Sequence, residues 1–279
     1  MSPLLDYEVR WVFSDLDGTI MRPDGHVPRS ARVAISEARA RGHRVILTTG
    51  RSDAQITPDV RELGFDGIIS GSGWRVELAD GTLLIDTELE PALVEHVAGL
   101  LDGAGVPYYY ETHGGLVSTE GAQPYLVALG DRLERPAREN WARHLANFVA
   151  TREAGAAHPV GITKIVHVEP LGEIAGLLPG RLRSMPPSVP VMPSGWGEIL
   201  PDDVHKAVAM LAVLDHFGAD RDQSVGIGDG LNDIELLTTA AVGIAMGNAA
   251  PEVTAVADLM TGDVESDGFA QAFRMLGLI

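Results

Sequence analysis

Apolar and polar residues alternate along the first part of the chain in a way that predicts strands and helices in turn. Apolar runs at Val9–Phe13, Arg44–Leu47 and Gly67–Ile69 predict buried strands. Between them, Pro28–Arg41 places apolar residues at helical spacing, and Asp53–Leu63 predicts a second helix that ends before a glycine. Strands that alternate with helices predict a parallel sheet covered by helices.

The pattern changes in the middle of the chain. Trp74–Leu78 and Thr82–Ile85 predict a hairpin closed by a turn that contains glycine. The segments that follow combine the periodicities of helices and of strands. Helices are expected at Pro91–Leu101, Arg138–Val149 and Leu171–Arg183. Strands are expected at Tyr108–Tyr110, Leu116–Ser118, Ile162–Val168 and Val189–Met192. This mixture predicts an α+β module with antiparallel pairing.

Alternation of strand and helix resumes in the last part of the chain. Helices are expected at Val204–Phe217, Asn232–Thr239, Pro251–Ala257 and Asp267–Leu276, and strands at Gln223–Ile227 and Val242–Ala245. A proline-rich stretch at 183–193 is typical of a domain boundary. We therefore expect a discontinuous α/β core of residues 1–84 and 191–279, interrupted by an inserted domain of residues 85–190.

Charge narrows the set of partners. The chain of 279 residues has 39 acidic and 21 basic side chains, a formal net charge of -18, and no block of lysine and arginine. Nucleic acid and anionic membranes are bound through clustered positive charge, so neither is an expected partner. A phosphate-bearing substrate would need a local positive group, either a bound cation or a well-placed lysine.

The absence of some residue types and patterns from the sequence excludes further kinds of site and segment. There are no cysteines, so disulfides, thiolate zinc sites and a cysteine nucleophile are excluded. No apolar run approaches the roughly 20 residues of a membrane span, and the first residues lack the pattern of a signal peptide. We expect a cytoplasmic protein, and the sequence predicts nothing about its oligomeric state.

The segment Asp15-Leu16-Asp17-Gly18-Thr19 is the most informative part of the chain. It directly follows the first predicted strand. Side chains two residues apart on a strand share a face, and two buried carboxylates side by side are costly unless a positive group lies between them. An aspartate at a strand end can attack phosphorus or hold a hard cation. An Asp-Gly turn that closes a hairpin accounts for the same residues equally well.

Three further segments can be interpreted in two ways. Thr48–Arg51 offers a hydroxyl and a glycine for binding phosphate, or a helix cap. Lys206 stands in the first turn of a helix and, taken alone, is best interpreted as a surface lysine. Gly228–Asp233 supplies oxygen ligands that suit Mg²⁺, or a turn with a helix cap. Because ligands bind at the carboxyl ends of strands in α/β sheets, the four segments could meet in space.

Taken together and in this order, the four segments resemble the motifs of the haloacid dehalogenase (HAD) superfamily. The position of the insertion resembles the large cap of its Cof-type subgroup, and Glu198–Pro201, Ala245–Ala249 and Asp267-Gly268 add to the likeness. The resemblance implies an α/β fold with a HAD-like, Rossmannoid three-layer core and a parallel sheet, plus an inserted α+β cap domain. It also implies a phosphoric monoester hydrolase that uses Mg²⁺.

The resemblance assigns roles to individual residues. Asp15 would be the nucleophile that forms an aspartyl-phosphate, and Asp17 the general acid and base. Thr19 would brace the loop. Mg²⁺ would be held by Asp15, the backbone carbonyl of Asp17 and Asp229, with Asp233 helping directly or through water. The phosphoryl group would be bound by Thr49 and Lys206 and by backbone N–H groups near Leu16, Asp17 and Gly50. Asn232 would orient Lys206 or the phosphate.

The chain departs from the subgroup at two places. Ser72-Gly73-Trp74 stands where Asn-Gly-Ala is usual, and Asp203 and Ala207 replace glycines that are usual around the lysine. These departures leave the core chemistry intact but weaken any substrate inferred from relatives. Arg51, Ser72 and His113 are candidate substrate-contacting residues, and each is equally compatible with a core or surface position.

Three functions are compatible with these features. The leading expectation is a Mg²⁺-dependent phosphatase that acts on a small phosphorylated metabolite, such as a sugar phosphate, through an aspartyl-phosphate. A sugar phosphomutase is the alternative, although it calls for additional cations in the cap, where basic residues are few. A binding module that has kept the fold without activity is the third, because fold alone does not guarantee activity.

Overall fold

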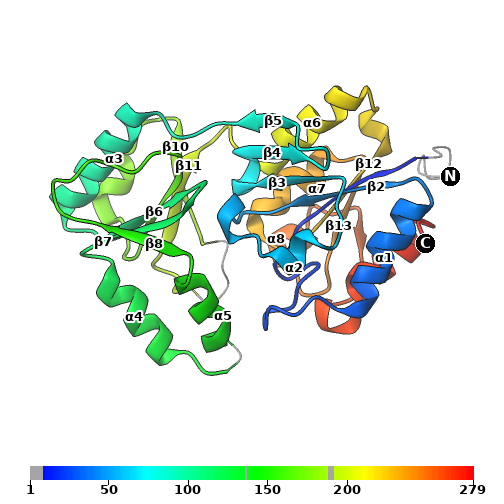
Figure 1. Cartoon of the computed structure of the whole chain (residues 1–279), viewed down its shortest axis with the longest axis horizontal. Coiled ribbons are helices and arrows are strands. Elements are labelled where there is room, and N and C mark those ends of the chain that lie inside the picture. Colours follow the sequence, from blue (N-terminus) through cyan, green and yellow to red (C-terminus); the bar gives the residue numbers. More distant parts are fainter. Residues whose placement is uncertain (1–8, 136, 188–191) are drawn as a thin grey trace. The chain divides into compact units, whose positions relative to one another are not determined.

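The structure, a computed structural model, describes residues 9–135, 137–187 and 192–279 (Figure 1). Its described residues form two compact units. The first unit contains the residues up to Arg51, then Ile56–Asp86 and His205–Ile279. The second unit contains Ser52–Gln55 and Thr87–Val204. Within the described residues, no helix is both long enough and apolar enough to cross a membrane.

The first unit is built on an eight-stranded sheet in the order β14-β13-β12-β1-β2-β3-β4-β5. The strands from β14 to β3 are parallel, and the hairpin of β4 and β5 adds two antiparallel strands at one edge. Their bounds are β1 Trp11–Ser14, β2 Arg44–Thr48, β3 Gly67–Ser70, β4 Arg75–Leu78, β5 Leu83–Asp86, β12 Ser224–Gly228, β13 Val242–Ala245 and β14 Leu259–Met260.

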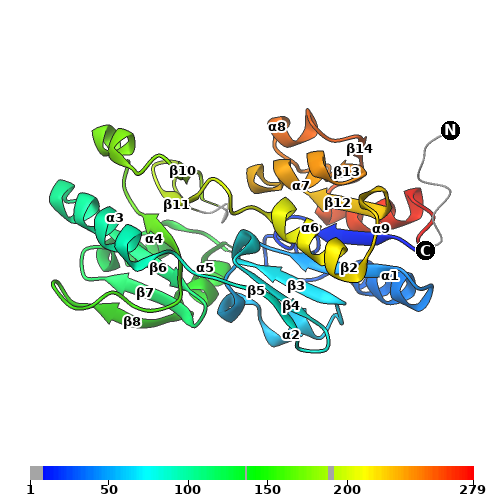
Figure 2. The same ribbon diagram turned by 90° about the horizontal axis from the view of Figure 1, so that it is seen from above.

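Helices cover both faces of this sheet (Figure 2). Neighbouring residues of β1 point to opposite sides: Val12 belongs to one apolar core, and Trp11 and Phe13 belong to the other. The first core is closed by α1 (Arg29–Ala40), α2 (Pro58–Arg61) and α9 (Gly268–Met275), and the second by α6 (Lys206–Phe217), α7 (Ile234–Thr239) and α8 (Pro251–Thr254). The predicted three-layer α/β core is therefore confirmed.

The second unit contains a six-stranded sheet in the order β10-β11-β9-β6-β7-β8. Its neighbouring strands are antiparallel, apart from β7 and β8, which are parallel and so differ from the expected pairing. The strands are β6 Tyr108–Thr112, β7 Gly115–Thr119, β8 Phe148–Arg152, β9 Ile162–His167, β10 Leu182–Met185 and β11 Gly197–Pro201; the helices are α3 Pro91–Ala104, α4 Gln123–Arg132 and α5 Ala137–Leu145.

The helix expected at Asp53–Leu63 is broken in two. A 3₁₀ turn covers Asp53–Gln55, and α2 begins only at Pro58. Thr57, the residue before the proline, is extended, with φ -67° and ψ 154°. Proline disfavours helical geometry at the preceding residue and has no N–H to continue the helix. The remaining 3₁₀ turns among the described residues are Gly71–Gly73, Gly172–Leu177, Arg221–Gln223, Leu231–Asp233 and Val264–Ser266.

Two of the helix predictions for the second unit are partly wrong. Instead of reaching Val149, α5 ends at Leu145, because Phe148 begins β8 and pairs with β7. The helix expected at Leu171–Arg183 is only a 3₁₀ turn, and Leu182 begins β10, which pairs with β11. Helix α4 and strands β11 and β14 were not expected. The strand expected at Val189–Met192 falls, except for Met192, outside the described residues.

The two units divide at a different point from the boundary expected at residue 190. The second unit continues to Val204, because β11 pairs with β9 and β10 and so belongs to the smaller sheet. The chain first enters the second unit at Ser52–Gln55, which was not expected; its later crossing, between Asp86 and Thr87, lies two residues from the expected boundary. That the second unit acts as a cap stays a prediction.

A close approach of backbones at β13 generates a test of the packing. A Cβ added at Gly243 would lie 2.5 Å from the carbonyl oxygen of Leu237 in α7, which is backbone and has little freedom to move. We expect Gly243→Ala to lower the free energy of unfolding by about 1–3 kcal/mol, the usual cost of overpacking. The measurement is urea unfolding followed by circular dichroism.

The matched control is Gly99→Ala in α3, where nothing lies within 4 Å of the added Cβ. Alanine should stabilise this helix by about 0.5–1 kcal/mol. An unchanged unfolding midpoint for Gly243→Ala would contradict the close approach of β13 and α7.

Candidate active site

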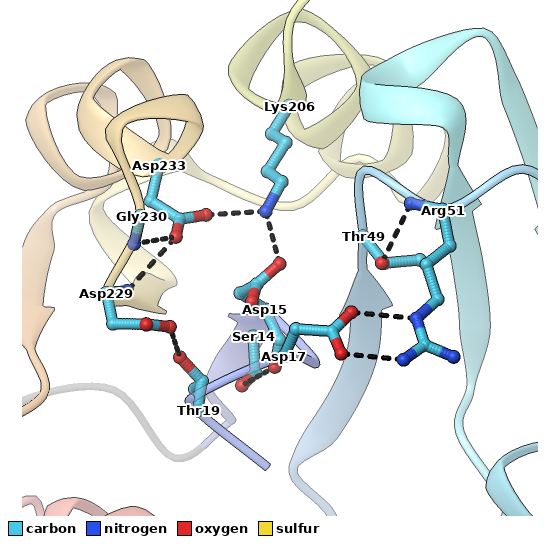
Figure 3. Close-up of polar contacts among 10 residues, drawn as sticks. All are labelled: Ser14, Asp15, Asp17, Thr19, Thr49, Arg51, Lys206, Asp229, Gly230 and Asp233. Carbon is cyan, nitrogen blue, oxygen red and sulfur yellow. Dashed lines mark hydrogen bonds and ion pairs between the residues drawn. The ribbon is translucent and has the colours of Figure 1, made fainter. Parts of the chain in front are cut away.

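Three neighbouring strands of the first unit end in polar loops at one edge of the sheet (Figure 3). β1 lies between β2 and β12, and all three are parallel. Asp15 follows β1, and its N–H donates to the carbonyl of Ile227 at 2.9 Å. Thr49 follows β2 and donates in the same way to Ile69 at 2.8 Å, and Asp229 follows β12. The carboxyl ends of the strands thus bring three separated motifs together, as expected for this class of sheet.

Lys206 is the first residue of α6, and its side chain is fully buried. Its Nζ donates to Asp15 Oδ1 and, at 2.6 Å, to Asp233 Oδ1. The interpretation of this residue as a surface lysine is therefore wrong. A buried ammonium is tolerated because two carboxylates surround it.

Asp233 connects the lysine to the loop after β12. Its Oδ2 accepts hydrogen bonds from the backbone N–H groups of Asp229 and Gly230, both at 3.0 Å. One oxygen of this carboxylate thus binds the loop, while the other binds Lys206. The position and orientation of Asp229 therefore depend on Asp233.

Asp229 accepts hydrogen bonds from two parts of the chain. Its Oδ1 accepts from the Thr19 hydroxyl at 2.7 Å. Its Oδ2 lies 3.3 Å from Nδ2 of Asn248, which also donates to the carbonyl of Gly18 at 2.8 Å. Gly18 has a φ of 81°, and a Cβ there would lie 2.2 Å from Asp229 Oδ2, so only glycine lets the two loops approach this closely. Asn248 was not predicted as a site residue; the segment Ala245–Ala249, part of the family resemblance, was the only signal for it.

The buried carboxylates raise one another's pKa. Burial raises the pKa of Asp15 well above its ordinary value, and Lys206 opposes this effect. Asp233, Asp229 and Asp17 raise it further by repulsion. Burial and then Asp233 raise the pKa of Asp229 to about 7. The pKa of Lys206 is also raised, because Asp15 and then Asp233 outweigh the effect of burial. Excess negative charge is therefore concentrated at this strand edge.

A divalent cation fits this arrangement. One ligand oxygen from each of Asp15, Asp229 and Asp233 lies within 4.8 Å of the others. Carboxylate oxygens are the ligands that Mg²⁺ prefers, and a cation would relieve the repulsion that raises the pKa of Asp15 and Asp229. The side chain of Asp17 is not part of this group. These three residues are the ones that could hold the metal.

Asp17 is paired with an arginine instead. Arg51 Nε donates to Asp17 Oδ2 at 2.7 Å, and its Nη2 donates to Oδ1 at 2.6 Å (Figure 3). Burial would lower the pKa of Arg51, but the charge and hydrogen bonds of Asp17 raise it. Arg51, expected as a substrate-contacting residue, is thus in direct contact with the predicted general acid.

The other predicted site residues lie in several environments. The Thr49 hydroxyl accepts from the Arg51 N–H at 3.1 Å, which leaves its own proton available to an acceptor. Ser72 is buried with a φ of 63°, and its N–H donates to the carbonyl of Thr49 at 2.9 Å. Leu16 is buried, and its carbonyl accepts from the N–H of Met21 at 2.7 Å.

Asn232 has no hydrogen bond to the cluster in the part of the chain that the structure describes, and His113 belongs to the other unit. Asn232 lies in the 3₁₀ turn after β12 and is half-buried. His113 belongs to the second unit, where its Nε2 lies 2.8 Å from the carbonyl oxygen of Thr87. Their roles therefore stay predictions.

Comparison with known proteins identifies the family. The model of the haloacid dehalogenase-like hydrolases matches residues 12–273, nearly the whole chain. The chain therefore belongs to this family and is a hydrolase of the phosphatase type. This confirms the prediction of the HAD superfamily and of its Cof-type subgroup. YkrA of Bacillus subtilis (strain 168) is 26% identical over 278 residues, which cover 96% of this chain and 98% of YkrA. The HMP-PP phosphatase of Cronobacter sakazakii is 26% identical over 245 residues, which cover 86% of this chain and 85% of that protein.

Solved structures show the same fold. BT1666 from Bacteroides thetaiotaomicron, described among the phosphatases of the HAD superfamily, matches with a TM-score of 0.80 and 20% identity over 99% of this chain and 97% of its own. BT4131, described as a HAD subclass IIB sugar phosphatase, matches with a TM-score of 0.78 and 22% identity over 97% of this chain and 100% of its own. At these identities the likeness establishes the fold alone.

The hydrogen bond from Thr19 to Asp229 generates a prediction for the metal-free protein. Thr19→Val keeps the shape of the side chain but removes the donor to a largely buried carboxylate. We expect the free energy of unfolding to fall by about 1.5–3 kcal/mol, the range for hydrogen bonds to charged groups. Chemical unfolding in the presence of a chelator measures it.

Thr48→Val is the control. Thr48 is buried, and its hydroxyl has no hydrogen-bond partner among the residues that the structure describes. Its removal should leave stability unchanged or raise it, because no bond is lost. If the two variants lose equal stability, the bond between Thr19 and Asp229 is not the cause.

Proposed function

We propose that this protein is a Mg²⁺-dependent phosphatase that hydrolyses a small phosphorylated metabolite through an aspartyl-phosphate. The observation that carries the proposal is the environment of Asp15. This carboxylate stands at a strand end, bonded to the buried Lys206 and beside two further carboxylates that could share a divalent cation with it. A nucleophile that attacks a dianionic phosphate requires such compensation of charge.

The first chemical step would transfer the phosphoryl group to the enzyme. A carboxylate oxygen of Asp15 forms a bond to phosphorus, and the bond between phosphorus and the leaving oxygen breaks. Asp17 supplies the proton that the leaving oxygen takes up. Lys206 and the Thr49 hydroxyl would bind the phosphoryl oxygens. Mg²⁺ held by Asp15, Asp229, Asp233 and the carbonyl of Asp17 would supply further positive charge.

The second step would release phosphate. A water molecule attacks the phosphorus of the aspartyl-phosphate and gives a proton to Asp17, which was left ionised by the first step. The bond between phosphorus and Asp15 breaks, so inorganic phosphate leaves and both aspartates return to their starting states. The net reaction consumes one ester and one water.

The class of substrate is proposed from size and from the relatives. An HMP-PP phosphatase and a sugar phosphatase are among the proteins that this chain resembles. Both names point to small phosphorylated compounds, and the net charge of -18 disfavours large polyanions such as nucleic acid. A panel of sugar phosphates and phosphorylated cofactors would identify the compound.

Removal of the nucleophile is the first test of this function. We expect wild-type protein to release phosphate from p-nitrophenyl phosphate with Mg²⁺ and to lose this activity with EDTA. Asp15→Asn should lower kcat by at least about a thousandfold, because the attacking oxygen is replaced by an amide. Asp131→Asn, which removes an exposed charge from α4, is the control and should match wild type. Equal rates for Asp15→Asn and wild type would refute the proposal.

A second test detects the covalent intermediate. Asp17→Asn should still be phosphorylated by p-nitrophenyl phosphate, whose leaving group departs without a proton, but should hydrolyse the intermediate slowly. Borohydride reduces an aspartyl-phosphate to homoserine, so mass spectrometry of the trapped variant should find homoserine at position 15. Modification at another residue, or at none, would contradict the assignment of Asp15.

With a hexose 1-phosphate and a bisphosphate, isomerised sugar phosphate without free phosphate would indicate a mutase instead.

A further inference from the structure

The carboxylate of Asp229 differs from the other three aspartates of the site in the kind of partner that it has. Each of the other three is paired with a lysine or an arginine. Among the residues that the structure describes, Asp229 forms no ion pair, and its side chain accepts from the Thr19 hydroxyl and the Asn248 amide. Neutral donors orient a carboxylate without cancelling its charge, whereas a cationic partner would offset that charge. Asp229 therefore keeps its negative charge for a bound ion.

The side-chain amide of Asn248 is held in one orientation by the groups around it. Its Oδ1 accepts from the backbone N–H of Val264 at 2.9 Å. Its Nδ2 donates to the carbonyl of Gly18 at 2.8 Å and to Oδ2 of Asp229 at 3.3 Å. An N–H can bond only to the oxygen of the amide, and a carbonyl or carboxylate only to its nitrogen. The three partners therefore direct the amide nitrogen at the first motif and at Asp229.

The loop that carries Asn248 follows β13 and is also held through its backbone. The N–H of Ala250 donates to the carbonyl of Asp229 at 3.1 Å. Gly247 packs closely against the loop after β14, because a Cβ at this glycine would lie 2.7 Å from the backbone nitrogen of Asp263. The support of the amide is therefore fixed on both sides, as precise positioning requires.

The same amide also fixes the backbone of the first motif. The N–H of Gly18 donates to the carbonyl of Met21 at 2.8 Å, and the carbonyl of Gly18 accepts from Asn248. The peptide group that contains the Gly18 N–H also contains the carbonyl of Asp17, one of the proposed metal ligands. Because the N–H and C=O of a trans peptide point in opposite directions, the direction of that carbonyl is set as well. Asn248 therefore joins two loops that each supply a proposed ligand.

We infer that Asn248 is a positioning residue for the metal site: it holds the carboxylate of Asp229 and the loop of Asp17 together without cancelling the charge of Asp229. The inference rests on the proposed function, since it concerns the Mg²⁺ which that function requires. It deepens that function by assigning a part to a residue outside the four motifs. Removal of a group that orients a metal ligand typically weakens metal binding by about 10–100-fold.

The experiment measures Mg²⁺ binding directly, by isothermal titration calorimetry of the full chain with MgCl₂. We expect Asn248→Ala to raise the dissociation constant about tenfold, because the carboxylate of Asp229 loses a donor that orients it. Asn147→Ala is the matched control. It removes another side-chain amide that donates to a backbone carbonyl, that of Arg143 at 3.1 Å, in the second unit. The control should bind Mg²⁺ as tightly as wild type does.

Two further measurements separate positioning of the metal site from a purely structural role. In EDTA, the urea unfolding midpoint of Asn248→Ala should stay close to that of wild type, because this side chain is exposed. With p-nitrophenyl phosphate, the Mg²⁺ concentration that gives the half-maximal rate should rise about tenfold. At saturating Mg²⁺, kcat should change by less than about twofold, because mass action restores the occupied site. A variant that had only lost stability would show a lower midpoint and an unchanged Mg²⁺ requirement.

If Asn248→Ala is not folded by circular dichroism, Asn248→Gln takes its place. This variant keeps the amide but moves it by one methylene, so it should weaken Mg²⁺ binding in the same direction. A folded variant whose dissociation constant for Mg²⁺ equals that of wild type would overturn the inference alone. Absence of both Mg²⁺ binding and Mg²⁺-dependent hydrolysis in wild-type protein would instead overturn the proposed function, and the inference with it. The two failures are therefore distinguishable.

Discussion

The buried ammonium group of Lys206, bonded to Asp15 and Asp233, is the interaction on which the site depends. It joins the start of α6 to the ends of β1 and β12, which come from opposite ends of the sequence. A fully buried charge of this kind is tolerated only while its partners remain, and loss of one partner leaves the others uncompensated. The contact that fixes the side chain of Asp15 therefore also ties the start of α6 to the strand ends.

Two cations cannot neutralise the four carboxylates gathered at this edge. Lys206 is shared between two of them, and Arg51 is occupied by Asp17, so Asp229 is left with the hydroxyl of Thr19 and the amide of Asn248. Burial first, and then repulsion from Asp233, raises the pKa of Asp229 to about 7. A protein that only had to be stable would gain by replacing such residues with apolar ones. Their retention is understandable if a divalent cation supplies the missing charge.

The sequence predicted the centre of the site better than its surroundings. Carboxylates directly after apolar strands are a local signal, and parallel strands bring their carboxyl ends together whatever the rest of the chain does. By contrast, the burial of Lys206 and the pairing of Arg51 with Asp17 depend on the direction of side chains across a loop, which periodicity does not encode. In the second unit, Phe148 and Leu182 became strand residues because partners distant in sequence were available, and this tertiary effect overrode their helical spacing.

The chain turns after Asp15, and this turn resolves the problem that the first motif poses. On a continued strand, Asp15 and Asp17 would share a face and repel each other. Instead, the carbonyl of Leu16 accepts from Met21, and Gly18 adopts a φ of 81° that returns the chain toward Asp229. The two carboxylates therefore separate, one toward Lys206 and the other toward Arg51. One turn of backbone therefore gives each carboxylate its own cation, instead of leaving two negative charges side by side on one face of a strand.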